Sequence, residues 1–411
     1  MIIKRNHFLP ALIFLILLPA WAPVCSYARV KTGIEVLAQE HPEMVRGKKL
    51  AILTSKTAVD LNLTHSIDRL AKAASIKLIL IGDPCFRKSA TSAPPLSFKY
   101  DTLTGARIIE VSDPLKRPPV DAFQGIELLV IDFQDIGIRY FKYLTLTAQF
   151  LDLAREASIP VLLLDRPNPI NASIVSGPVL EVPMRSRFGV YPIPLIHGMT
   201  IGELALYFNK VFGLGASLTV IGMEGYSRSM AFKDTGLHWV PPSDHIPEAD
   251  SPLYYSTTGF LGEMGVFSTG VGTNRPFHYI LAPWIDGEML AQNLEEHRMP
   301  GVRFVPATEK PYYGLFAQKK INGIEIVVTD RLTFDPFLAG MAILRTLYEL
   351  YPDQIPLKNP AAAEALDTIL GSNKIREGIL AGQPLMHIYS TLQRDLAEFI
   401  KKRREFMIYP E

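Results

Sequence analysis

The chain has 411 residues, of which 48% are hydrophobic and 20% are charged. This length is ample for a packed core and favours two domains over one. Its 42 Lys and Arg residues nearly balance its 41 Asp and Glu residues, whereas proteins that hold nucleic acid by its phosphates normally carry a basic surplus or patch. The composition therefore argues against a nucleic-acid partner.

The first 28 residues are typical of a secretory signal peptide. Lys4 and Arg5 precede an apolar stretch over residues 8–21, and Ser26-Tyr27-Ala28 supplies the small residues of a cleavage site near Ala28. The apolar stretch is too short to cross a bilayer comfortably. We therefore expect an exported protein, periplasmic or extracellular, without a stable membrane span. A retained membrane anchor is the alternative.

After this leader, short apolar runs alternate with stretches of helical periodicity, which predicts strands separated by helices. The expected strands lie at residues 50–54, 77–81, 107–111, 127–133, 161–165 and 218–222, and the expected helices at 63–74, 144–157 and 200–212. Continuously apolar strands of this kind indicate a parallel sheet that is covered on both faces. Residues 29–250 are thus predicted to form a doubly wound α/β domain.

A domain boundary is expected near residue 250, because residues 239–252 contain four prolines and no glycine. The remainder mixes both kinds of element, with strands expected at 302–306 and 323–329 and helices at 287–296, 336–351 and 385–404. Residues 251–411 are therefore predicted to form a smaller α+β domain.

Chemistry is expected at the carboxyl ends of the parallel strands, where ligands bind in open sheets of this type. Four strand ends are followed by polar side chains, and the conspicuous ones are Asp83, Asp132, Gln134, Asp135, Arg139, Tyr140, Asp165 and Asn168. His197 lies just before the next expected helix. Carboxylates, amides and an arginine on one edge suit a polyhydroxylated ligand.

Several common sites are excluded by their missing motifs. No G-x-G-x-x-G follows the first strand, no G-x-x-x-x-G-K-[ST] occurs, and the nine histidines show no H-E-x-x-H spacing. These motifs carry the phosphate-binding turns and zinc ligands of large enzyme classes. We therefore predict no cofactor and no metal.

Six ordered sequence blocks resemble the exo-β-N-acetylmuramidase family. The clearest are Asp132-Phe-Gln-Asp-Ile-Gly-Ile-Arg139, Asp165-Arg-Pro-Asn-Pro169 and Tyr191-Pro-Ile-Pro-Leu-Ile-His-Gly-Met-Thr200, and the similarity extends over about residues 33–409. The resemblance implies a Rossmann-like N-terminal domain, a smaller C-terminal domain and a site in the cleft between them. It also implies release of N-acetylmuramic acid from the non-reducing ends of peptidoglycan fragments.

The sequence departs from the family's pattern at two places. Family members usually carry G-P-E-H-G-F-R after the second strand, where this chain has Gly82-Asp-Pro-Cys-Phe-Arg87, so Asp83 stands for the glutamate that is the favoured catalytic candidate. A second block reads S-T-G-V-G-T at residues 268–273 instead of S-E-G-R-G-T, whereas Glu263 aligns with a family glutamate. Because glycoside hydrolysis usually needs two carboxyl groups, we predict Asp83 and Glu263 as the acid/base pair. The other polar residues of the edge, with Tyr140 and His197, would bind the sugar.

Structural roles compete with these assignments. Asp83 before a proline is also typical of a turn, Asp132 and Asp135 could cap the next helix, and Arg139 could pair with one of these aspartates. Glu203 is expected to belong to a capping box. At the level of function, the alternatives are a muropeptide-binding protein without turnover and a hydrolase of another amino sugar.

Overall fold

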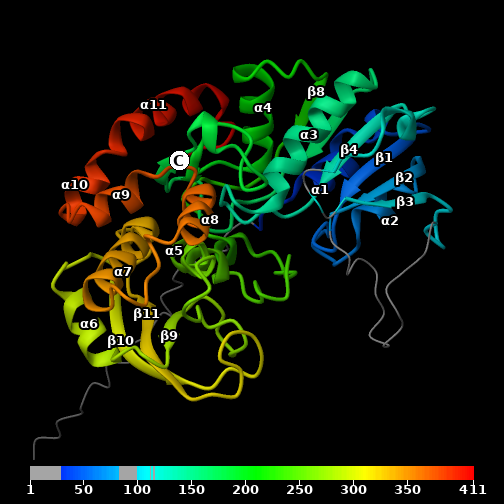
Figure 1. Ribbon diagram of the computed structural model, residues 1–411. Coiled ribbons are helices and arrows are strands. Elements are labelled where there is room, and N and C mark those ends of the chain that lie inside the picture. The colour runs from blue at the N-terminus through cyan, green and yellow to red at the C-terminus, as the bar shows by residue number, and fades with distance from the viewer. Residues whose placement is uncertain (1–28, 83–99, 112, 114–115) are drawn as a thin grey trace, which may run out of the picture.

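The computed structural model describes residues 29–82, 100–111, 113 and 116–411, arranged as an α/β domain followed by an α+β domain (Figure 1). The expected signal peptide and Asp83 therefore lie outside the described residues. In the part of the chain that is described, no helix is long and apolar enough to cross a membrane.

A six-stranded parallel sheet forms the centre of the N-terminal domain, with strand order β3-β2-β1-β4-β5-β8. Its strands are β1 (Lys49–Thr54), β2 (Ser75–Ile81), β3 (Arg107–Glu110), β4 (Leu128–Asp132), β5 (Val161–Leu164) and β8 (Leu218–Ile221). Each lies within about two residues of its expected position. Thr54 at the end of β1 is in register with Asp132 at the end of β4, so the polar segments that follow these strands start at one edge.

Helices cover both faces of this sheet, as the continuously apolar strands predict. One face, with Leu53 and Ile131, packs under α3 (Lys142–Glu156) and α4 (Ile201–Val211). The other face, with Ile52 and Val130, packs under α1 (Gly33–Glu40) and α2 (Ser66–Leu70). The doubly wound fold is confirmed.

The helix expected over residues 63–74 is shorter than predicted. Leu63 is exposed and has a φ of 59°, which a helix does not allow, so only Ser66–Leu70 is helical. By contrast, α4 begins as expected: the Thr200 hydroxyl accepts a hydrogen bond from the Glu203 N–H, and Glu203 accepts one from the Thr200 N–H. Glu203 also forms a fully buried ion pair with Arg228. Its structural role is confirmed.

The C-terminal domain contains an antiparallel sheet with strand order β10-β11-β9, packed against helices. Its elements are α5 (Ser251–Gly262), β9 (Tyr279–Ala282), α6 (Gly287–Glu295), β10 (Val302–Glu309), β11 (Ile321–Val328), α7 (Pro336–Leu350), α8 (Pro360–Leu370), α9 (Lys374–Leu380), α10 (Leu385–Ser390) and α11 (Gln393–Arg403). The single helix expected over 385–404 is thus two helices. Fully buried Phe337, Met341 and Leu344 on α7 form part of the core.

A small antiparallel pair, β6 (Ser176–Val179) and β7 (Pro194–Ile196), contacts α7 and α11 through β6. Short 3-10 helices complete the described structure, at Pro42–Met44, Val120–Phe123, Val182–Met184, Phe232–Thr235 and Arg404–Phe406. Helix α11 packs against β6 and returns the chain to the N-terminal domain, where the C-terminus lies (Figure 1).

The C-terminal segment is bound to the N-terminal domain by buried hydrogen bonds. The Tyr409 hydroxyl donates to Asp165 at 2.6 Å and accepts from the Met223 N–H at 3.0 Å. Tyr409→Phe should therefore lower the free energy of unfolding by about 2 kcal/mol, because it leaves both buried partners with one hydrogen bond fewer. Urea unfolding measures this, with exposed Tyr312→Phe as the control. An unchanged midpoint would contradict a structural role for this segment.

Candidate active site

Asp132, the last residue of β4, is held by an arginine from the neighbouring strand end. Arg166 Nε donates to Asp132 Oδ1 at 2.6 Å and Arg166 Nη2 donates to Oδ2 at 3.1 Å, with both side chains buried. Such two-pronged pairs combine strength with a fixed geometry. Arg166 also donates to the Val59 carbonyl at 2.9 Å. The pair therefore fixes the segments after β1, β4 and β5 relative to one another.

Gln134 joins the same three segments by its own hydrogen bonds. Its backbone N–H donates to the Thr57 hydroxyl at 2.9 Å, and its side-chain amide donates to the carbonyls of Pro167 at 2.6 Å and Asp135 at 2.7 Å. The amide nitrogen of Gln134 thus donates to two protein carbonyls. The predicted contact of Gln134 with substrate would therefore have to be made by its amide oxygen.

Asp135 and His197 form a buried pair with two unpartnered atoms. Asp135 Oδ2 accepts from the Gly137 N–H at 2.8 Å, and His197 Nδ1 accepts from the Met199 N–H at 3.2 Å. Asp135 Oδ1 and His197 Nε2 have no hydrogen-bond partner among the described residues.

The protonation of this pair follows from its burial. Burial raises the pKa of Asp135 to about 7, against the opposing N–H groups of Gly137 and Ile136. Burial, reinforced by the positive charges of Arg403 and Arg139, lowers the pKa of His197 to about 3. Nε2 of His197 lies 3.9 Å from Asp135 Oδ2, but a neutral imidazole forms no ion pair. Between these two pKa values both groups are uncharged, and Asp135 carries a proton.

Asp165 and Asn168 are bound to the protein itself. Asp165 is fully buried and accepts hydrogen bonds from the Thr200 hydroxyl at 2.7 Å and the Gly202 N–H at 2.8 Å, in addition to Tyr409. Asn168 donates to the Met199 carbonyl at 3.0 Å. In this conformation both side chains hold the loop after β5 against α4, and their predicted sugar contacts find no support in the geometry.

Arg139 and Tyr140 also have protein partners. Arg139 makes no ion pair with the aspartates, contrary to one expectation, and donates instead to four backbone carbonyls. The Tyr140 hydroxyl donates to the Tyr255 carbonyl on α5 at 2.7 Å. These contacts join the loop after β4 to the C-terminal domain. The capping alternative for the aspartates is wrong, because Phe141 is the N-cap of α3.

Glu263 lies exposed at the C-terminal end of α5. Burial raises the pKa of the Tyr140 and Tyr255 hydroxyls, and the charge of Glu263 raises both further. The predicted Glu263 is therefore within electrostatic range of the loop that carries Asp135 to Tyr140. Asp83 is outside the described residues, but Lys142, which no sequence motif singles out, donates to the carbonyl of Gly82 immediately before it.

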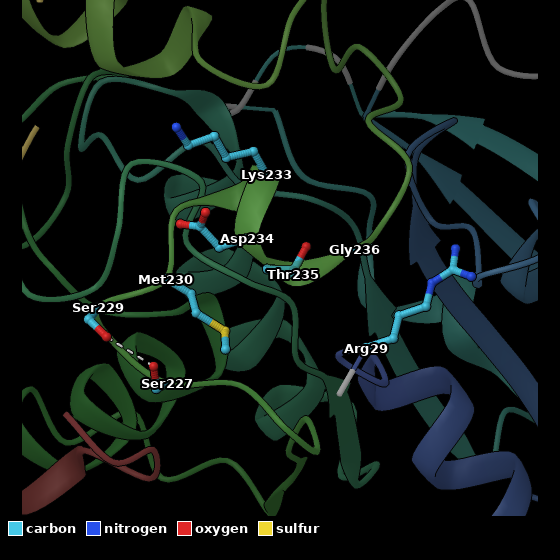
Figure 2. A pocket seen from close by; sticks show the side chains of 8 residues that line it. All are labelled: Arg29, Ser227, Ser229, Met230, Lys233, Asp234, Thr235 and Gly236. Carbon is cyan, nitrogen blue, oxygen red and sulfur yellow. Dashed lines mark hydrogen bonds between the residues drawn. The ribbon is translucent and has the colours of Figure 1, made fainter. Parts of the chain in front are cut away.

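Two hollows adjoin the segment 232–238 near this edge. The first has a volume of about 10 Å³, room for about one water molecule, and is lined by Thr57, Val59, Asp60, Gln134, Arg166, Phe232, Leu237, His238 and Val240. The second is broad, about 830 Å³. In Figure 2 the charged ends of Arg29 and Lys233 lie on opposite sides of this hollow, and the hydroxyls of Ser227 and Ser229 form a hydrogen bond. Its charges do not converge, so we favour the strand edge as the site.

Within the described residues, no group of three or more His, Cys, Asp or Glu side chains is arranged to hold a metal ion. The absence of a metal and of a cofactor stays a prediction.

Comparisons with known proteins match both domains. The N-terminal family model of the exo-beta-N-acetylmuramidase NamZ matches residues 50–250, and the C-terminal model matches residues 253–409. The peptidoglycan beta-N-acetylmuramidase NamZ of Bacillus subtilis (strain 168) is 33% identical over 383 residues, which cover 93% of this chain and 92% of that protein.

Two solved structures from Bacteroides fragilis NCTC 9343 share the fold, both described as DUF1343 family proteins. The first has a TM-score of 0.86 and 30% identity, and the match covers 93% of this chain and 99% of that chain. The second has a TM-score of 0.72 and 22% identity, and the match covers 93% and 100% of the two chains. Both matches extend over the two domains together.

Proposed function

Because this chain belongs to the NamZ family of exo-β-N-acetylmuramidases, we propose that it is an exported glycoside hydrolase that releases N-acetylmuramic acid from the non-reducing ends of peptidoglycan fragments. The observation that carries the proposal is the match over both domains to a peptidoglycan β-N-acetylmuramidase. Export rests on the leader-like residues 1–28, with cleavage near Ala28.

In this proposal Asp83 and Glu263 supply the two carboxyl groups of the reaction. One protonates the glycosidic oxygen as the bond to the anomeric carbon breaks, and the other acts on that carbon directly or through water. Glu263 comes from the C-terminal domain and Asp83 follows β2 of the N-terminal sheet, so the scissile bond would lie between the domains. The family's glutamate and histidine are replaced here by Asp83 and Pro84, and an aspartate side chain is one methylene shorter than a glutamate.

Residues at the ends of β4 and β5 would shape the sugar site. Arg166, Asp132 and Gln134 hold the loops around it in place. Asp135, protonated below about pH 7, can donate a hydrogen bond to a sugar oxygen. A neutral donor suits an anionic substrate, because the lactyl group of N-acetylmuramic acid carries a carboxylate that an ionised Asp135 would repel.

Two other functions are alternatives to this proposal. The shortened carboxylate at Asp83 favours a muropeptide-binding protein that has lost turnover as the second candidate. Hydrolysis of a different amino sugar is the third.

A chromogenic β-N-acetylmuramide tests the proposal, with the N-acetylglucosaminide as its comparison. Residues 29–411 should release the chromophore from the muramide, and Asp83→Asn and Glu263→Gln should each lower kcat at least about a hundredfold, as expected for loss of a general acid or base. Binding of the muramide without release would favour the binding protein, and faster cleavage of the glucosaminide would favour the third candidate. Unchanged turnover in Asp83→Asn would refute that residue's assignment.

A further inference from the structure

Two tyrosines are exposed side by side on the connection between β10 and β11. Tyr312 is 77% exposed and Tyr313 is 51% exposed. We call residues 310–320 the tyrosine loop. Large aromatic side chains normally contribute to cores and interfaces because they carry so much apolar area. Two neighbouring exposed rings therefore point to a binding surface.

The tyrosine loop is held in one shape by its backbone. The Tyr312 N–H donates to the Gly272 carbonyl at 2.8 Å, and the Gln318 N–H donates to the Pro311 carbonyl at 2.8 Å. Gly272 has a φ of 92°, and a Cβ there would lie 2.0 Å from the Tyr313 carbonyl oxygen. The rings are therefore presented by an ordered backbone, which lowers the entropy cost of binding a ligand.

Contacts connect the tyrosine loop to the carboxyl edge of the parallel sheet. The rings of Tyr313 and His245 are nearly parallel, at 22°, with centroids 6.3 Å apart. The neighbouring Asp244 lies 3.7 Å from the ammonium of Lys56, which closely follows β1. In Figure 1 the yellow β10–β11 connection extends to the side of the C-terminal domain nearer the N-terminal sheet. The tyrosine loop is thus connected, through residues 244 and 245, to the segment that follows β1.

The chemistry of the tyrosine loop suits a glycan with negative charges. A tyrosine ring offers an apolar face to the C–H groups of a pyranose and a hydroxyl to its oxygens. Lys310, Lys319 and Lys320 are exposed and form no ion pair within the described chain. Their charges complement the carboxylates of lactyl groups and stem peptides.

We propose that the tyrosine loop is a second sugar-binding subsite, which stacks Tyr312 and Tyr313 on a glycan unit beyond the residue that is cleaved. The inference rests on the proposed function, because it takes the glycan of that function as its ligand. It predicts that the loop contributes to the binding of chains and contributes nothing to a single sugar.

The test compares a chromogenic muramide with a peptidoglycan tetrasaccharide. In the double variant Tyr312→Ala/Tyr313→Ala, kcat/KM for the tetrasaccharide should fall about tenfold, the effect of losing one or two aromatic contacts, while kcat/KM for the muramide stays unchanged. Tyr312→Phe/Tyr313→Phe should keep most of the parent's kcat/KM for the tetrasaccharide, because both rings can still stack on the sugar. Tyr100→Ala is the matched control, because Tyr100 is also 60% exposed but is bridged to Arg107 at the amino end of β3.

Binding separates failure of this inference from failure of the proposed function. If the parent protein cleaves neither substrate, calorimetry with the intact tetrasaccharide still applies, and weaker binding to the alanine variant alone supports the subsite. Equal tetrasaccharide affinity or equal kcat/KM in parent and alanine variant would overturn the inference. An equal loss for the muramide would also overturn it, because the loop would then act on the cleaved sugar.

Discussion

Asp135→Asn is expected to make the protein more stable at pH 8 and to change how substrate binding depends on pH. The unfolded carboxyl has a pKa near 3.9, whereas burial raises the pKa of the folded carboxyl to about 7. Between these values the folded state keeps a proton that the unfolded state has released. The free energy of unfolding therefore falls as the pH rises from about 4 to 7 and stays lower above pH 7.

The size of this fall in the free energy of unfolding follows from the difference between the folded and unfolded pKa values of Asp135, which corresponds to about 4 kcal/mol. Asparagine does not ionise, and its side-chain oxygen can still accept from the Gly137 N–H that Asp135 binds at 2.8 Å. Urea unfolding should thus show little difference between variant and parent at pH 4 and a gain of about 4 kcal/mol at pH 8. Destabilisation at pH 8 would mean that Asp135 is ionised and paired in the native state.

Kinetics on the same variant test whether Asp135 contacts the sugar. The amide of asparagine keeps an N–H donor where the protonated acid has its O–H, so KM of the variant should stay flat across pH 7 while KM of the parent rises. Asp132→Asn is the contrasting control, because it leaves Arg166 buried without its ion pair and should destabilise the protein by roughly 3–5 kcal/mol. The same rise in KM for parent and Asp135→Asn would exclude the contact.

The position of the site edge could be predicted from sequence, but the task of each residue on it could not. Apolar strands identify the sheet, and parallel strands place their following segments at one edge, so Asp132, Gln134 and Asp135 lie together as expected. Whether a side chain at this edge bonds to the protein or stays free for a ligand depends on partners that are distant in the sequence. Asp165 is bound by Tyr409, 244 residues further along the chain, and no local pattern announces that contact.

Local signals also explain which helices could be predicted from the sequence. The capping box of α4 and the Asp286 N-cap of α6 are short-range patterns, and both are present. Helix α5 has no such signal, because ten of its twelve residues are buried and it lacks a polar face. Its Thr257 and Thr258 hydroxyls donate to carbonyls one turn earlier, so these polar residues are satisfied inside the core. A helix buried on all sides loses the periodicity by which helices are recognised.

Arg139→Met should cause a large loss of stability, about 4 kcal/mol or more. Nη1 of Arg139 donates to the carbonyls of Pro178 and Ile193, each at 2.8 Å, and Nη2 donates to those of Ile369 at 3.2 Å and Leu370 at 2.5 Å. The first two carbonyls belong to the N-terminal part of the chain, and the last two end α8 of the C-terminal domain. Methionine fills similar space but leaves all four acceptors without this donor.

Two measurements separate this structural role from the sugar contact that the sequence suggested. Thermal unfolding should show the loss, while kcat per folded molecule stays near the parent value. Arg139→Lys should rescue stability only in part, because one ammonium cannot reproduce two diverging pairs of hydrogen bonds. Arg303→Met serves as the control, since the Arg303 side chain is 63% exposed and its loss should cost little. A stable Arg139→Met protein without turnover would instead place Arg139 on the substrate.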